Sequence, residues 1–265
     1  MSNNVISLQD VTIGYPARHH CHHVIGSNMQ ATAPKGTMTC IIGRNGTGKS
    51  TLLRSIARLQ NRLGGDILLN GHSIDSYAQD EFARLLSIVL TSRPDAQSMT
   101  VYELVALGRT PYTGFWGRLS DEDRKIVDHA LYMVGMQNMS RRRVCSLSDG
   151  ECQKVMIAKS LAQGTPIILL DEPTAFLDFH GKVELLTLLR RLAHNEGKTI
   201  LLSTHDLEAA LQTADRLWML DKDGIHEGEP KLLVANGDVD RYIGQKGVSV
   251  DKDFRIKISV SDNNN

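Results

Sequence analysis

The residues best suited to do chemistry lie in one glycine-rich stretch, whose spacing fits the pattern G-x-x-x-x-G-K-[S/T]. The stretch runs Gly43, Arg44, Asn45, Gly46, Thr47, Gly48, Lys49, Ser50 and Thr51. Its glycines would let consecutive backbone N–H groups turn inward around a phosphate, at the positive end of a new helix. Lys49 would supply a charge for the β- and γ-phosphates, and the Ser50 hydroxyl a ligand for Mg²⁺. The stretch predicts a site for a nucleoside triphosphate.

Two acidic residues, Asp171 and Glu172, form a second candidate group. They end an apolar run over 167–170 that has the composition of a parallel strand covered on both faces. Ligands of open α/β sheets bind beyond the carboxyl ends of such strands, so both acids should lie beside the glycine-rich stretch. Asp171 could hold Mg²⁺, directly or through a water, and Glu172 could polarise an attacking water.

Two rings at strand ends could complete this site. His205 follows an apolar strand expected over 199–203, where it could hydrogen-bond the γ-phosphate and sense its loss. Tyr15 ends a strand expected over 5–15. The Tyr15 ring is either an ordinary packed aromatic or a flat surface on which a nucleotide base stacks.

A second potential anion site involves Ser148 and Gly150, which lie directly before a helix expected over 152–162. Backbone N–H groups at a helix start attract anions, although any capped helix looks similar. The sequence alone does not say what this helix start would bind.

Alternating strands and helices must position these residues. A strand over 38–42 and a helix over 50–59 would flank the glycine-rich stretch. Strands are also expected over 67–70 and 86–90, with a short helix over 78–85 between them. From 91 to 145 the pattern becomes helical, most clearly over 101–107 and 121–134, where Ser120 and Asp123 resemble a helix cap.

Residues 108–117 are expected to form a loop between these two helices, rich in aromatic residues and turn formers. Exposed aromatic residues on a loop either pack back onto their own lobe or form a contact patch for a partner. The sequence favours neither reading.

Composition narrows the class of protein. The 265 residues are 41% hydrophobic, enough for one large α/β domain or for a domain that carries a lobe. With 30 basic and 30 acidic residues the net charge is zero, so no nucleic-acid partner is indicated. No apolar run is long enough to span a bilayer, so membrane association should go through a partner. The four cysteines lack CxxC spacing and no secretory signal is evident, which suggests the reducing cytoplasm.

A histidine-rich run over 18–23 invites a metal hypothesis, because it holds histidine and cysteine side chains in close succession. Neighbouring residues of an extended segment point to opposite sides, so few of them could converge on one ion. A solvated hairpin loop is the favoured reading.

Taken in order, the motifs resemble the ATP-binding cassette (ABC) subunit of membrane transporters. They are Tyr15 at a strand end, GRNGTGKST over 43–51, LSDGE over 147–151, ILLDEP over 168–173, AFLD over 175–178 and STHD over 203–206. The resemblance covers about residues 5–220. TVYELV over 100–105 and LGRTP over 107–111 are most similar to importer subunits for iron-siderophore, haem and cobalamin.

The resemblance implies an α/β fold with a P-loop NTPase (RecA-like) core, an antiparallel β subdomain and an inserted helical subdomain. The whole chain, 1–265, would be a single ABC ATPase domain. Residues 1–90 and 146–221 would form the nucleotide-binding core, residues 91–145 the helical lobe, and residues 222–265 a C-terminal extension. Beyond the resemblance, the alternation of charged and apolar residues over 222–260 predicts added strands, and residues 261–265 are expected to be disordered.

The resemblance further implies a head-to-tail homodimer that binds ATP and Mg²⁺. Ser148 and Gly150 of one copy would cover the γ-phosphate held by the other, and Asp178 would position the loop at the dimer seam. Glu172, His205 and Lys49 would be catalytic. An integral-membrane permease would bind the helical lobe and place the protein at the cytoplasmic face of the membrane, with a substrate-binding protein acting indirectly.

Two positions depart from the family pattern. Thr91 stands where the family has a glutamine that reaches toward Mg²⁺, so Thr91 is a doubtful metal ligand. Asp149, Gly150 and Glu151 replace Gly-Gly-Gln, and a carboxylate near a triphosphate costs energy unless it points away or cations offset it. The basic run over 141–143 could supply those cations. A soluble ATPase of an assembly machine, such as iron–sulfur cluster biogenesis, is the alternative function.

Overall fold

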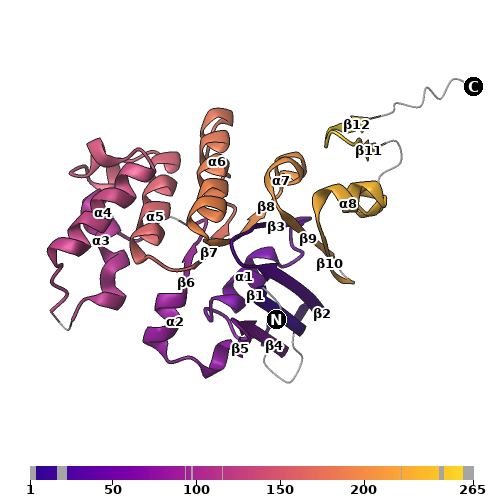
Figure 1. Ribbon diagram of the computed structural model, residues 1–265, viewed down its shortest axis with the longest axis horizontal. Helices are drawn as coiled ribbons and strands as arrows, with labels where there is room; N and C mark the ends of the chain where they lie inside the picture. The colour runs from indigo at the N-terminus through magenta and orange to yellow at the C-terminus, as the bar shows by residue number, and fades with distance from the viewer. Residues whose placement is uncertain are drawn as a thin grey trace, which may run out of the picture.

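The centre of the molecule is a six-stranded sheet that carries the strand-end motifs (Figure 1). The computed structural model describes residues 4–16, 23–92, 94–96, 98–114, 116–221, 223–244 and 248–258. In spatial order the strands are β10 (Gly224–Gly228), β9 (Arg216–Asp221), β3 (Met38–Gly43), β8 (Thr199–Thr204), β7 (Ile167–Asp171) and β6 (Leu86–Val89). All are parallel except β10. The residues that follow β3, β7 and β8 therefore meet at one edge of the sheet.

A second, antiparallel sheet has the order β2-β1-β4-β5. Its strands are β1 (Asn4–Tyr15), β2 (His23–Pro34), β4 (Gly64–Leu69) and β5 (His72–Ser73). β1 and β2 pair as far as Tyr15 opposite His23, which confirms the strand expected over 5–15. Residues 18–22, most of the histidine-rich run, lie outside the described residues.

The core lies on both faces of the central sheet. On β3, Ile41 faces the antiparallel sheet and α1 (Lys49–Ile56), whereas Cys40 and Ile42 face α5 (Asp149–Gln163), α6 (Phe179–Glu196) and α7 (Leu207–Thr213). Figure 1 shows α6 and α7 on one side of the sheet and β1, β2 and β4 on the other. Both faces of β3, β7 and β8 are buried, which explains their continuous apolar sequences.

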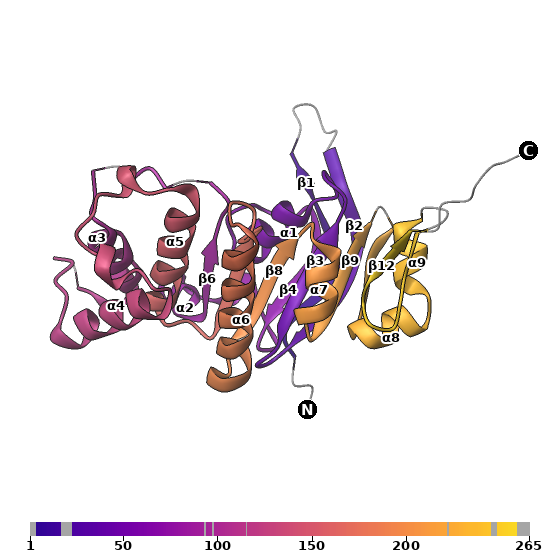
Figure 2. The same ribbon diagram turned by 90° about the horizontal axis from the view of Figure 1, so that it is seen from above.

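Helices lie on both sides of β6 in the chain, and most of them fall between β6 and α5. They are α2 (Gln79–Leu85), before β6, and then α3 (Val101–Ala106) and α4 (Asp121–Met133), with short 3-10 turns over Ile74–Ser76, Gln137–Met139 and Val144–Ser146. The Ser120 hydroxyl accepts the Asp123 N–H at 3.1 Å and the Asp123 carboxylate accepts the Ser120 N–H at 3.0 Å, so the expected cap is present. α3 and α4 pack against α5, and Figure 2 places them at one end of the molecule. The domain boundaries at 90 and 146 stay a prediction.

The loop expected over 108–117 is wrong in its first half, because Leu107–Tyr112 forms a 3-10 helix. Arg109 holds this turn from inside the protein. Its guanidinium donates to Asp123 Oδ1 at 2.8 Å and to the Ala162 carbonyl at 2.9 Å, and lies 3.9 Å from the centre of the Tyr112 ring. Asp123 and Ala162 lie 14 and 53 positions away in the sequence, so the local pattern of turn formers could not reveal these two partners.

The chain ends in a small C-terminal unit, residues 230–258, at the opposite end of the molecule from α3 and α4 (Figure 2). It contains α8 (Pro230–Ala235), α9 (Asp238–Ile243) and a hairpin of β11 (Val248–Val250) and β12 (Ile256–Ile258). The sequence predicted only strands here, and the two helices correct it. Proline at the first helical position favours the start of α8, and Leu233 and Val239 bury themselves in the core.

Within the described residues, no helix combines the length and apolar character needed to cross a membrane.

Breaking the buried ion pair between Arg109 and Asp123, whose atoms lie 2.8 Å apart, should destabilise the helical region. Arg109→Met leaves the Asp123 carboxylate without its cation, and we expect it to lower the free energy of unfolding by about 3 kcal/mol. Urea denaturation at pH 7 measures this. The Arg109→Met/Asp123→Leu double variant is the matched control and should recover part of the loss. A loss near zero in the single variant would contradict this reading.

The same pair predicts an acid dependence of stability. The Ser120 hydroxyl, followed by Arg109, lowers the pKa of Asp123 from its usual value of 3.8 to about 2. A carboxyl whose pKa is lower in the folded state stabilises the fold above its unfolded pKa. Its contribution should be complete above about pH 4 and lost between about pH 4 and 2. Asp123→Asn should make the urea midpoint depend less on pH over this range.

Candidate functional site

The stretch over 43–51, hereafter the phosphate loop, connects β3 directly to α1. Gly46 and Gly48 have φ angles of 83° and 99°, a conformation that favours glycine. A Cβ on Gly48 would lie 2.7 Å from Ile25 and 2.9 Å from Ile13, so no side chain fits there. These glycines give the loop the backbone path of an anion-binding nest.

Lys49 lies inside this loop. Its Nζ donates to the carbonyls of Gly43 at 2.8 Å and Arg44 at 3.4 Å, and lies 3.9 Å from the Glu172 carboxylate. The side chain is only 6% exposed. Burial lowers the pKa of Lys49, while the Glu172 and Asp171 carboxylates oppose this shift. A charged ammonium held at a loop of inward N–H groups suits a polyphosphate anion.

Asp171, the last residue of β7, joins the start of α1 to the end of β8 at the carboxyl edge of the sheet. Its Oδ1 accepts the hydroxyl of Ser50 at 2.8 Å and the hydroxyl of Ser203 at 2.8 Å. The Glu172 N–H in turn donates to the Ser203 hydroxyl at 2.9 Å. Ser203 was not predicted as a site residue. Its signal was its place at the end of β8, directly opposite Asp171 in the ladder.

The hydroxyl of Ser50 and the carboxylate of Asp171 are the hard oxygen donors that Mg²⁺ prefers. The described residues hold no cluster of three or more His, Cys, Asp or Glu side chains able to bind a metal ion. A partial donor set of this kind fits Mg²⁺, which usually completes its shell with waters and substrate phosphates.

Glu172 and His205, which follow the ends of β7 and β8, face each other. The Nδ1 atom of His205 lies 3.6 Å from the Glu172 carboxylate, and the His205 side chain is 55% exposed. Glu172 has a φ of 47°, an uncommon conformation for a residue with a side chain. Such strain is concentrated at functional sites, where surrounding contacts hold it. Here the hydrogen bond from its N–H to Ser203 does so.

Tyr15 flanks the phosphate loop at the end of β1. Its hydroxyl lies 3.5 Å from the Thr51 hydroxyl, and the residue is 45% exposed. The ring is therefore not an ordinary core aromatic. Stacking on a nucleotide base stays a prediction.

Ser148, Gly150 and Asp178 lie at helix starts, apart from this cluster. Ser148 and Glu151 cap α5 reciprocally, with the Glu151 N–H donating to Ser148 Oγ at 3.3 Å and the Ser148 N–H donating to Glu151 Oε2 at 2.8 Å. Asp178 caps α6 by accepting the Gly181 N–H at 2.8 Å. No hydrogen bond or ion pair in the described part of the chain joins Ser148, Gly150 or Asp178 to the phosphate loop.

The Glu151 carboxylate is hydrogen-bonded to the start of its own helix, α5. The Ser148 backbone N–H is the main cause that lowers the pKa of Glu151, and Arg142 lies 3.9 Å from the carboxylate. The substitution of glutamate for glutamine therefore leaves a charge that is already partly compensated before any phosphate approaches.

The comparisons with known proteins decide the family. Residues 27–175 match the family model described as ABC transporter. The iron(3+)-hydroxamate import ATP-binding protein FhuC of Bacillus subtilis is 38% identical over 258 residues, 97% of this chain and 94% of the relative. The achromobactin transport ATP-binding protein CbrD of Dickeya dadantii is 42% identical over 213 residues, 80% of this chain and 77% of the relative.

The chain belongs to the ABC transporter family. It is an ATP-binding ABC ATPase with the cassette fold. A solved dimer of the cassette MJ0796, in a post-hydrolysis state bound to ADP and Pi, is 27% identical with a TM-score of 0.75. The match covers 85% of this chain and 98% of that one.

Thr91, one of the two positions expected to depart from the family pattern, contacts the site. Its hydroxyl donates to the backbone carbonyl of Asp171 at 2.9 Å. The Thr91 hydroxyl proton is therefore used in a hydrogen bond to the last residue of β7. The role of Thr91 as a metal ligand stays a prediction.

We predict that Thr91→Gln retains ATP hydrolysis, because the glutamine amide can donate to the same Asp171 carbonyl. Thr91→Val keeps the shape and removes the donor, so it should lower turnover about threefold, the cost of one modest hydrogen bond. Steady-state phosphate release measures both variants. A collapse of activity in Thr91→Gln would contradict the prediction by showing that the threonine is specifically required.

Proposed function

We propose that this cassette is the ATP-hydrolysing subunit of an importer for iron-siderophore, haem or cobalamin. The observation that carries the proposal is the similarity, over nearly the whole length of both chains, to a protein named for iron(3+)-hydroxamate import. The second relative is named for transport of achromobactin. Import therefore has more support than the alternative role in an assembly machine such as iron–sulfur cluster biogenesis.

The strand-end cluster would bind and hydrolyse ATP. Lys49 and the loop N–H groups would hold the β- and γ-phosphates, and Tyr15 the base. Ser50 and Asp171 would hold Mg²⁺, whose chemistry is to neutralise phosphate charge. Glu172 would accept a proton from the attacking water, and His205, beside it, would hydrogen-bond the γ-phosphate.

A second copy of the chain would complete each site. Ser148 and Gly150 start α5, which Figures 1 and 2 both place apart from α1 and the phosphate loop. In a head-to-tail dimer this helix start would cover the γ-phosphate bound by the other copy, with Asp178 at the seam. ATP would then hold the copies together, and hydrolysis would release them.

The helical region offers a surface for a membrane permease. A cavity of about 460 Å³ opens between α1, α2, β6 and α5, with Arg58 and Lys159 but no acidic side chain among its described lining residues. Arg84 follows the lining residue Ala83 in the chain, and its guanidinium lies 5.4 Å from the centre of the Tyr112 ring. The Arg109 guanidinium lies 3.9 Å from the same ring, which is 41% exposed. A fixed aromatic residue next to a basic groove suits a permease segment that carries apolar and acidic side chains. The permease would hold the cassette at the cytoplasmic face of the membrane, and a substrate-binding protein would act through it.

Expression with the neighbouring membrane and substrate-binding subunits tests the proposed function. We expect the cassette to co-purify with a polytopic membrane protein, and ATP hydrolysis in the reconstituted complex to rise when the correct iron chelate or corrinoid is added. Recovery with soluble partners only, and no response to any of these ligands, would overturn it.

Glu172→Gln tests the proposed chemistry. The amide cannot accept the proton of the attacking water, so turnover should fall by at least about a hundredfold while ATP binding persists. We expect ATP to trap this variant as a closed dimer in size-exclusion chromatography. Full turnover in the variant would remove Glu172 from the mechanism.

A further inference from the structure

The phosphate loop contacts the C-terminal unit through the side chain of Arg44. Its Nη2 atom donates to the backbone carbonyl of Ile243 at 3.2 Å, between residues 199 positions apart in the chain. Ile243 is the last residue of α9, and the final carbonyls of a helix lack partners within it. A cation at this end also interacts favourably with the helix dipole.

A second contact lies beside the first. The Tyr242 hydroxyl donates to the carbonyl of Leu220 at 3.5 Å, and Leu220 pairs with Gly43 where β9 runs alongside β3. Burial, with a smaller effect of Asp221, raises the pKa of the Tyr242 hydroxyl, and the nearby Arg44 cation opposes the shift. The end of α9 therefore lies against the first two residues of the phosphate loop.

The C-terminal unit is itself anchored to the domain. Leu233, Val239 and Val250 are buried in the same core as Leu217 and Met219 of β9. Within the unit, the Asp240 carboxylate accepts the Val250 N–H at 2.8 Å and ties α9 to β11. The unit can therefore act as a fixed support.

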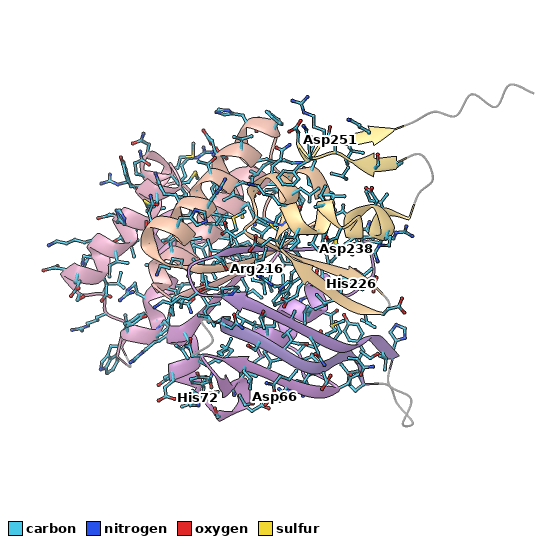
Figure 3. The ribbon with its side chains drawn as sticks, turned by 45° about the vertical axis from the view of Figure 1, so that its right-hand side comes forward. Asp66, His72, Arg216, His226, Asp238 and Asp251 are labelled. Atoms are coloured by element: carbon cyan, nitrogen blue, oxygen red, sulfur yellow. The ribbon has the colours of Figure 1, made fainter. Side chains whose placement is uncertain are left out.

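Figure 3 shows Asp238 and Asp251 of this unit on the same side of the molecule as Arg216 and His226. The latter two lie on β9 and β10, the strands at that edge of the central sheet. The unit thus lies beside the strand that borders the phosphate loop.

Arg44 also organises the loop through its own backbone. The Arg44 carbonyl accepts the Thr47 hydroxyl at 2.9 Å, the Thr47 N–H at 3.3 Å and Lys49 Nζ at 3.4 Å. One residue therefore bonds the inside of the loop with its carbonyl and α9 with its side chain. Fixing the side chain restricts the backbone that shapes the nest.

We propose that the C-terminal unit positions the phosphate loop for nucleotide, with Arg44 as the positioning residue. A loop held in its binding conformation loses less entropy when the ligand arrives, so the contact with α9 raises nucleotide affinity. The inference rests on the nucleotide-binding role of the loop and is independent of what the transporter imports. It also gives the C-terminal unit a means of adjusting the ATPase, because coupling between two sites is reciprocal.

A double-mutant cycle on the isolated chain tests the proposal, with the dissociation constant for Mg–ADP as the readout. Arg44→Ala removes the donor. Gly244→Pro displaces the acceptor, since proline cannot adopt the φ of 60° at Gly244 and lacks the N–H that bonds the Asp240 carbonyl. Each variant should weaken binding about fivefold, as expected for an exposed charge-assisted hydrogen bond. The double variant should be no weaker than either single one.

The matched control is Gly197→Pro, which changes the equivalent glycine at the end of α6, where φ is 66°. It should leave nucleotide affinity unchanged. Losses that add in the double variant would overturn the proposal by showing that Arg44 acts directly on the phosphates. So would a folded Gly244→Pro variant with unchanged affinity.

Hydrogen exchange provides a second measurement that does not depend on the Gly244 variant. Saturating ADP should slow exchange of the α9 amides in the unaltered chain but not in Arg44→Ala. Equal exchange with and without ADP in the unaltered chain would contradict the coupling. Both measurements use only the isolated chain and ADP, so failure of any iron chelate to stimulate hydrolysis would leave their outcome intact.

Discussion

One carboxylate oxygen, Asp171 Oδ1, accepts hydrogen bonds from two hydroxyl groups, and the geometry of the site depends on this arrangement. Ser50 brings the start of α1, Ser203 the end of β8, and Asp171 the end of β7. These three segments are far apart in the chain and become neighbours only because β3, β8 and β7 are adjacent parallel strands. Parallel strands need long crossovers, so this core contains several helices by necessity. Two of those helices, α5 and α6, cover the face of the central sheet that lies away from the antiparallel sheet. Ser148 caps the start of α5, and Asp178 caps the start of α6.

Features that depend on local sequence could be predicted, and features that depend on register or distant partners could not. The phosphate loop and the acidic end of β7 are each contiguous, so spacing and apolar runs reveal them. Ser203 was not predicted as a site residue, because its place opposite Asp171 is a property of strand pairing. The turn at Leu107–Tyr112 escaped for a related reason, since its anchor, Arg109, bonds Asp123 and the Ala162 carbonyl.

The charged side chains of the site already have partners in the chain itself. The ammonium of Lys49 faces the Glu172 carboxylate, Glu172 faces His205, and the extra carboxylate at Glu151 is held by Ser148 and lies near Arg142. A triphosphate would therefore replace existing partners of Lys49, such as the Gly43 carbonyl and the Glu172 carboxylate. The contacts of Glu151 reduce the cost of having that carboxylate at a helix start that, in the proposed dimer, would meet a phosphate.

We infer that one chain holds only half of a hydrolytic site. The decisive measurement is turnover per chain as a function of protein concentration, with saturating Mg–ATP. If a second copy supplies Ser148 and Gly150, turnover should be low in dilute solution and rise with concentration to a plateau, while the fraction of chains that bind ATP stays constant. Turnover per chain that is the same at every concentration, in a protein that remains monomeric, would show that one chain holds a complete site.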